Sequence, residues 1–160
     1  MNSTIEEILD FWFGTFPDDW RCDPSKVEMW FKNGCAFDHE ISTRFGADYR
    51  LAVTGAYDPW MESPRGCLAL IILLDQFSRH IHRGTAAAFT QDVKAQAICL
   101  AGIERGDDLT LHPVERSFFY LPLEHAEDLN LQEQCLKAFK RLVDAVPLPH
   151  KTAFEVSLEW

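Results

Sequence analysis

Residues 67–84 read CLALIILLDQFSRHIHRG, the longest apolar run of the chain followed directly by a polar segment. The first half, residues 67–74, is apolar at every position, so a helix here needs neighbouring elements on all sides. The second half is polar apart from Phe77 and Ile81, whose spacing is typical of a helix. A buried strand is the alternative for the apolar half, but no turn residue separates the halves. We therefore expect one central helix that leaves the core at its polar end.

Ser63 and Pro64 begin this helix as N-cap and first helical residue, and we expect it to end near Arg83, before Gly84. Apolar residues recur at helical spacing elsewhere, and no segment alternates with a period of two over a useful length. Five of the other expected helices cover residues 5–13, 25–33, 37–54, 112–121 and 124–146. The remaining one, fifth along the chain, is capped by Thr85 or Thr90 and ends at residue 105.

Two helix starts carry a capping box, in which a hydroxyl and a later Glu satisfy free backbone amides. Ser3 with Glu6 predicts the first helix, and Ser25 with Glu28 predicts the second. Pro122 should end or kink the sixth helix because proline has no N–H. The apolar residues that we place on the inward sides of the fifth and seventh helices are Val93, Ala97, Leu100, Ala101 and Ile103, and Leu129, Leu136, Phe139 and Val143.

Seven antiparallel helices joined by short turns predict an all-α fold, in one domain that covers residues 1–160. Pairs of helices of similar length would suit a stack of helix hairpins of tetratricopeptide type. With 47% hydrophobic residues, the chain can close a core without metal or disulfide bonds.

Composition narrows the classes of partner. The formal net charge of −10, without a Lys/Arg block, argues against nucleic acid. No apolar run approaches the roughly 20 residues that cross a bilayer, so we expect no membrane partner. Acidic residues near the N-terminus and five scattered cysteines favour the reducing cytoplasm. Because no zinc spacing and no Gly-rich phosphate loop occurs, we expect no metal and no cofactor.

A first group of candidate residues lies on the polar half of the central helix. On a helical wheel Asp75 and Arg79 share one arc, and Gln76 and Arg83 share the neighbouring one. These residues could form only an intrahelical ion pair and a favourable dipole contact. Alternatively, Arg79 and Arg83 present forked donors to a carboxylate or phosphate, and Asp75 positions Arg79.

A second group begins the seventh expected helix. His125, Asp128 and Gln132 fall on the side of the wheel that carries the inward apolar stripe, so they need polar partners. We expect those partners at the polar end of the central helix. Asp128 could orient His125 as a general base, or simply satisfy a core histidine; the two could also supply two metal ligands, but no third is identifiable by spacing.

Three blocks of sequence resemble a bacterial family catalogued as domain of unknown function 924. They are residues 10–14 (DFWFG), 73–85 (LLDQFSRHIHRGT) and 121–128 (LPLEHAED). The resemblance implies an all-helical fold similar to tetratricopeptide superhelices and brings no established activity. Two departures are Ser78-Arg79-His80 where the family usually has Pro-Arg-Asn, and the lack of a further Phe-, Arg-, Pro- and Asn-rich segment after the seventh helix.

These residues support three hypotheses. The favoured one is a helical binding module that holds a small anionic ligand or peptide through Arg79, Arg83 and His125. The second is a hydrolase in which Asp128 orients His125 as general base and Arg79 stabilises negative charge. The third is a structural oligomerisation domain without a ligand, in which the partner would be a second copy of the chain in a homo-oligomer.

Overall fold

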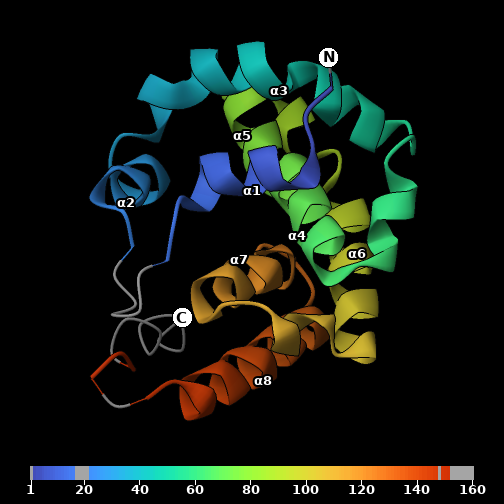
Figure 1. The fold of residues 1–160 in the computed structure, drawn as a ribbon. Helices are drawn as coiled ribbons and strands as arrows, with labels where there is room; N and C mark the ends of the chain where they lie inside the picture. Colours follow the sequence, from blue (N-terminus) through green and yellow to red (C-terminus); the bar gives the residue numbers. More distant parts are fainter. Residues whose placement is uncertain (1, 17–21, 148, 152–160) are drawn as a thin grey trace.

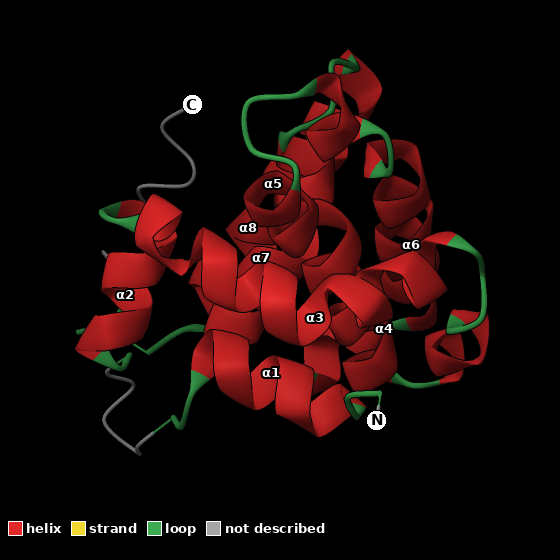
Figure 2. Ribbon diagram, turned by 90° about the horizontal axis from the view of Figure 1, so that it is seen from above, coloured by secondary structure: helices red, strands yellow, loops and turns green. Residues whose placement is uncertain are grey.

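The computed structural model describes residues 2–16, 22–147 and 149–151, and these ranges contain helices and turns but no strand (Figures 1 and 2). The elements are α1 (Ile5–Phe13), α2 (Pro24–Phe31), η1 (Gly34–Phe37), α3 (Asp38–Val53), η2 (Asp58–Glu62), α4 (Pro64–Ile71), η3 (Ile72–Phe77), α5 (Ser78–Ile81), η4 (Ala86–Phe89), α6 (Asp92–Arg105), η5 (Asp107–Thr110), α7 (Pro113–Glu124) and α8 (Leu129–Ala145). Because α4, η3 and α5 follow one another without a break, the described residues form the seven longer helices expected. The all-α prediction is confirmed. Within the described ranges, no helix combines the length and apolar character needed to cross a membrane.

The continuous helix α4–η3–α5 runs through the middle of the molecule (Figure 1). Helices α1, α6 and α7 pack against α4, and α3 packs against η3 and α5. Residues 67–74 are completely buried, as the apolar run predicts. Ser63 caps the helix by accepting a hydrogen bond from the backbone N–H of Gly66, and Pro64 follows as the first helical residue.

The middle of this helix differs from the expected regular α-helix, because η3 is a π-helical segment. A π turn holds more residues than an α turn. A helical wheel drawn for a regular α-helix therefore no longer gives the correct face for residues that follow the π segment. The apolar spacing of residues 67–74 contains no sign of this change, since every position there is apolar. Asp75, inside this segment, is fully buried, while the side chain of Arg79, one turn later, is 23% exposed.

The first predicted capping box is displaced by one residue, and the second is replaced by a single N-cap residue. Thr4 caps α1, with Glu7 as its reciprocal partner, and the backbone N–H of Ser3 donates instead to the buried Asp48. Asp23 caps α2, and Pro24 is its first residue. Proline suits that position because a first-turn N–H would have no helical acceptor, so the helix begins earlier than Ser25.

Two expectations for the fifth helix are wrong. Neither Thr85 nor Thr90 caps it: η4 intervenes, and α6 follows Gln91 without a side-chain cap. Val93 and Ala97 are exposed, and the buried residues are Ala95, Ile98, Cys99 and Gly102. Small residues face inward because α7 lies close: a Cβ on Gly102 would come within 2.5 Å of the Phe119 ring.

The boundary between the last two helices also differs from the prediction. Pro122 lies inside α7, which continues to Glu124, and α8 starts only at Leu129. Proline removes a single helical hydrogen bond near the helix end, and burial of Leu123 favours one more turn. The stripe predicted for the seventh helix is correct at Phe139 and Val143, but Leu129 and Leu136 are exposed; Cys135, Ala138 and Leu142 are buried instead.

Candidate functional site

The polar end of the central helix stands between two cavities, and Arg79 lines both. The first, which we call the His125 cavity, has a volume of about 580 Å³ and is lined by Arg79, Phe89, Asp92, Gln96, His125 and Glu127. The second, the Arg83 cavity, has a volume of about 390 Å³ and is lined by Met29, Trp30, Phe31, Lys32, Gly34, Cys35, Gln76, Arg79, His80 and Arg83. Both volumes suit a small ligand.

Asp75 connects the two sides of this region. Its side chain is completely buried, and a buried carboxylate needs strong donors. It accepts a hydrogen bond from the Gln76 amide, pairs with the Arg79 guanidinium at 3.2 Å and lies 2.9 Å from Nδ1 of His125. The expected meeting of His125 with the polar end of the central helix is therefore confirmed.

Arg79 is committed to partners within the chain. Its two terminal nitrogens each lie 3.2 Å from an oxygen of Asp92, a forked arrangement that joins α5 to α6. One of them also donates to the backbone carbonyl of Asp75, and the guanidinium lies over the Phe89 ring at 5.3 Å. An incoming anion would have to compete with Asp92 for this fork.

His125 is not part of α8 but ends α7 as its C-cap. Its side chain is 30% exposed and lines the cavity that we named after it. The neighbouring Glu124 is half-buried; burial raises the pKa of its carboxyl group, against the effect of His125.

Asp128 and Gln132 do not face inward and line neither cavity. Asp128 is the N-cap of α8 and accepts a hydrogen bond from the backbone N–H of Leu131, while Gln132 donates to the backbone carbonyl of Ala126. Both are exposed. The predicted pairing of Asp128 with His125 is therefore wrong, because the chain between them is a turn in place of the helix that would have put them on one face.

On the other side of Arg79, Asp38 at the start of α3 holds two side chains of the central helix. It accepts hydrogen bonds from Nε and a terminal nitrogen of Arg83, at 2.5 and 2.8 Å, and lies 2.8 Å from Nδ1 of His80. Partial burial raises the pKa of Asp38, but the hydrogen bonds from Arg83 and His80 outweigh it and lower the pKa overall. Burial lowers the pKa of His80, against the effect of Asp38.

The two cavities differ in the charged side chains that line them. Three cationic residues, Lys32, Arg79 and Arg83, line the Arg83 cavity, and its lining includes no Asp or Glu. The lining of the His125 cavity includes the carboxylates of Asp92 and Glu127. Of the predicted ligand-binding residues, Gln76, Arg79 and Arg83 share one cavity.

The sequence did not single out several residues of these cavities. Asp38 and Lys32 near the Arg83 cavity, and Phe89, Asp92 and Gln96 in the His125 cavity, come from other elements. An acidic residue in a first helical turn is so common that Asp38 and Asp92 carry no specific signal. Among the described residues, no group of three His, Cys, Asp or Glu side chains could hold a metal ion.

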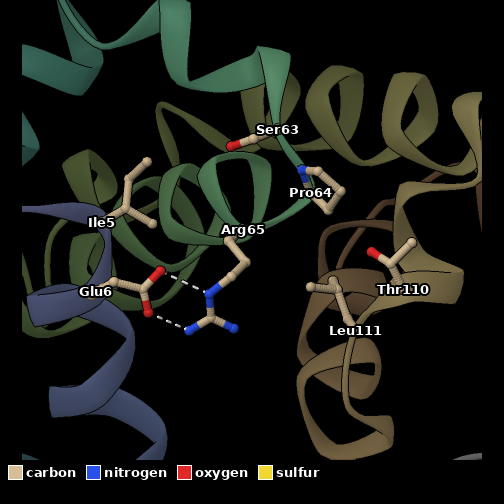
Figure 3. A pocket seen from close by; sticks show the side chains of 7 residues that line it. All are labelled: Ile5, Glu6, Ser63, Pro64, Arg65, Thr110 and Leu111. Atoms are coloured by element: carbon tan, nitrogen blue, oxygen red, sulfur yellow. Dashed lines mark hydrogen bonds and ion pairs between the residues drawn. The ribbon is translucent and has the colours of Figure 1, made fainter.

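A third cavity, of about 450 Å³, lies at the start of α4 and is lined by none of the predicted site residues (Figure 3). Arg65 lines it and donates two hydrogen bonds to Glu6 and one to the nearly buried Glu115. The hydrogen bonds to Glu6 raise the pKa of this guanidinium. Two carboxylates thus occupy Arg65 and tie α1, α4 and α7 together, so we assign this cluster a structural role.

Comparisons with known proteins agree with the helical architecture. Residues 8–158 match the model of a family described as "Bacterial protein of unknown function (DUF924)". The chain is similar to the solved structure of a protein of unknown function, ATU0120 from Agrobacterium tumefaciens, with 30% sequence identity and a TM-score of 0.77. The match covers 97% of this chain and 80% of the Agrobacterium chain. No curated protein matches the chain.

Proposed function

The chain belongs to the bacterial DUF924 family, and we propose that it is a helical binding module that holds a small anionic ligand in the Arg83 cavity. The observation that carries this proposal is the lining of that cavity by Lys32, Arg79 and Arg83 without a carboxylate. In a chain with a net charge of −10, a locally cationic cavity is where an anion would be favoured.

Donors are available in the Arg83 cavity. Lys32 is exposed and forms no ion pair with any described residue. Arg83 gives Nε and one terminal nitrogen to Asp38, so its other terminal nitrogen is left for a ligand. Gln76 donates to Asp75 and keeps its amide oxygen as an acceptor. These groups suit a carboxylate or phosphate that also carries a hydroxyl group.

The walls of the cavity add apolar surface beside these charges. Trp30 and Phe31, consecutive residues at the end of α2, line it, and Phe31 is 74% exposed. An apolar wall with a few polar groups is the usual composition of a small-molecule site. An acidic peptide end presents the same carboxylate, so a peptide is included in the proposal. The tetratricopeptide-like stacking of the helices is likewise proposed, by analogy with the family resemblance.

Charge reversal at Lys32 tests the proposal. Calorimetric titration with citrate and with inorganic phosphate should show binding to the wild-type protein and about tenfold weaker binding to Lys32→Glu, because a charge-assisted contact becomes repulsive. The matched control is Lys137→Glu: Lys137 is exposed on α8 and lines none of the three cavities, and the substitution changes the net charge equally.

Equal weakening in both variants would show that only the overall charge matters, and the proposed site would then be wrong. Absence of binding to the wild-type protein by either anion would also contradict the proposal and would favour an oligomerisation domain without a ligand.

A further inference from the structure

The His125 cavity supports an activity separate from anion binding. We propose that His125, positioned by the buried Asp75, is a general base that activates water to hydrolyse carboxylic esters bearing a cationic group. This inference goes beyond the proposed binding function and does not depend on it, because the two use different cavities.

The hydrogen bond to Asp75 defines the protonation of the imidazole ring. The Asp75 carboxylate can only accept, so Nδ1 of His125, 2.9 Å away, carries the proton. The alternative is that Nδ1 accepts from Arg79, which lies 3.2 Å away. That arrangement would turn the Nδ1 lone pair toward a carboxylate oxygen, which is repulsive. In the neutral ring, Nε2 therefore keeps the lone pair that a general base needs.

Because Nδ1 faces Asp75, the geometry of the ring turns Nε2 away from this carboxylate. Nδ1 points to a carboxylate with no exposed surface, whereas the ring itself lines a cavity of about 580 Å³ and is 30% exposed. The hydrogen bonds of the His125 ring with described residues involve Nδ1. The opposite nitrogen is thus free to contact a water molecule or a substrate.

The lining of the cavity identifies water as the nucleophile, since it includes no Ser, Thr or Cys. Nε2 takes a proton from water as the water oxygen bonds to the ester carbonyl carbon. The bond to the leaving alcohol oxygen then breaks, and the imidazolium returns the proton to that oxygen. Arg79 lines the same cavity, so a terminal nitrogen that it shares with Asp92 stabilises the negative charge on the carbonyl oxygen.

The rest of the lining indicates the class of ester. Glu127 is exposed and has no ion-pair partner among the described residues, and Gln96 lies in the same wall. Phe89 is 58% exposed, so part of its ring is open to a ligand. A carboxylate together with an aromatic ring is suited to an ammonium group. Asp92, although paired with Arg79, adds to the negative potential.

Two isosteric chromogenic esters test the inference: 4-nitrophenyl 4-(trimethylammonio)butanoate and its uncharged analogue, 4-nitrophenyl 5,5-dimethylhexanoate. We expect kcat/KM of the wild-type protein for the cationic ester to fall at least about 100-fold in His125→Gln, since general bases contribute that much. The control is His39→Gln, which removes an exposed imidazole from α3 and accounts for hydrolysis by surface histidines. It should leave kcat/KM unchanged.

Further readouts separate catalysis from structure. A general base acts only in its unprotonated form, so the wild-type rate should rise with pH, and this rise should be absent in His125→Gln. The charged groups around the ring are Asp75 and Arg79 from the central helix, Asp92 from α6, Glu124 at the end of α7 and Glu127 in the turn that follows it. Asp75→Asn, checked for folding by circular dichroism, should lower kcat while KM is kept.

Three results would overturn the inference: a wild-type rate no higher than that of His125→Gln, an equal loss in His39→Gln, or a pH profile that persists without His125. Glu127→Gln tests the substrate class, because it should reduce the preference for the cationic ester over its analogue. Equal hydrolysis of both esters by the wild-type protein would contradict the cationic substrate.

Discussion

Three donors reach the carboxylate of Asp75: the Gln76 amide, the Arg79 guanidinium and the His125 imidazole. If a buried carboxylate loses one of these partners, the free-energy cost of its desolvation remains while part of the compensating interaction is lost. The same cluster therefore contributes to the stability of the polar end of the helix and to the orientation of His125. A variant at Asp75 or Arg79 must be checked for folding before its binding or activity is interpreted.

His80 makes stability depend on pH. Burial lowers its pKa, so the unfolded chain takes up this proton at a higher pH than the folded chain does. Acidification below about pH 6.5 therefore favours the unfolded state, and the free energy of unfolding should fall as the pH drops toward the lowered pKa. Asp38, whose pKa is also lowered, loses its contribution in the same direction at lower pH.

The comparison that isolates this effect is urea unfolding of wild type and His80→Gln at about pH 7 and about pH 5. The wild-type protein should lose more stability between the two values than the variant does. Parallel losses would show that other groups, such as His112, whose pKa is also lowered by burial, dominate the acid response.

At the scale of the element, α4 approaches η2 so closely that only glycine fits at position 66. A Cβ there would lie 2.0 Å from the backbone carbonyl oxygen of Trp60 and 2.8 Å from the Ser63 hydroxyl that caps the helix. Neither group can move without breaking the start of α4. We expect Gly66→Ala to lower the free energy of unfolding by about 1–3 kcal/mol or more.

Gly46 in α3 is the matched control. It lies inside a helix with a negative φ, and a Cβ would meet only the end of the Arg50 side chain at 3.8 Å. Gly46→Ala should raise the free energy of unfolding by about 0.5–1 kcal/mol, because the unfolded chain becomes less flexible. Chemical denaturation measures the change in the free energy of unfolding for both variants, which should be negative for Gly66→Ala and positive for Gly46→Ala. A loss of stability in both variants would contradict this prediction.

At the scale of the whole molecule, the buried half of the central helix is the segment against which several other helices pack. Leu70 is completely buried at its centre, whereas Leu129 on α8 is 79% exposed. Leu70→Ala should lower the free energy of unfolding by about 2–5 kcal/mol, and Leu129→Ala should change it by less than about 0.5 kcal/mol.

Thermal unfolding followed by circular dichroism and by tryptophan fluorescence should give one coincident transition, because we expect residues 1–160 to form a single domain. Two separate transitions would contradict the single domain. A loss in Leu129→Ala as large as that in Leu70→Ala would show that α8 is covered by a further contact, such as a second copy of the chain.

The sequence alone determined the helical class, the central helix and its change from apolar to polar, because periodicity, capping residues and an uninterrupted apolar run act over one or two turns. It also predicted the pairing of Asp75 with Arg79, which are one turn apart. Exact helix boundaries were less predictable: Ser3 and Thr4 are both good caps, and burial of Leu123 carried α7 past Pro122.

Only the tertiary structure decided which acid His125 meets. Asp75 lies 50 positions away in sequence, and the nearer Asp128 is used to cap α8. Packing also assigned Asp38 to Arg83 and Asp92 to Arg79, and so divided one predicted pocket into two cavities with different charged linings. Contacts between distant segments depend on how whole helices pack, and helix packing is determined by the summed burial of many side chains, which no local pattern contains.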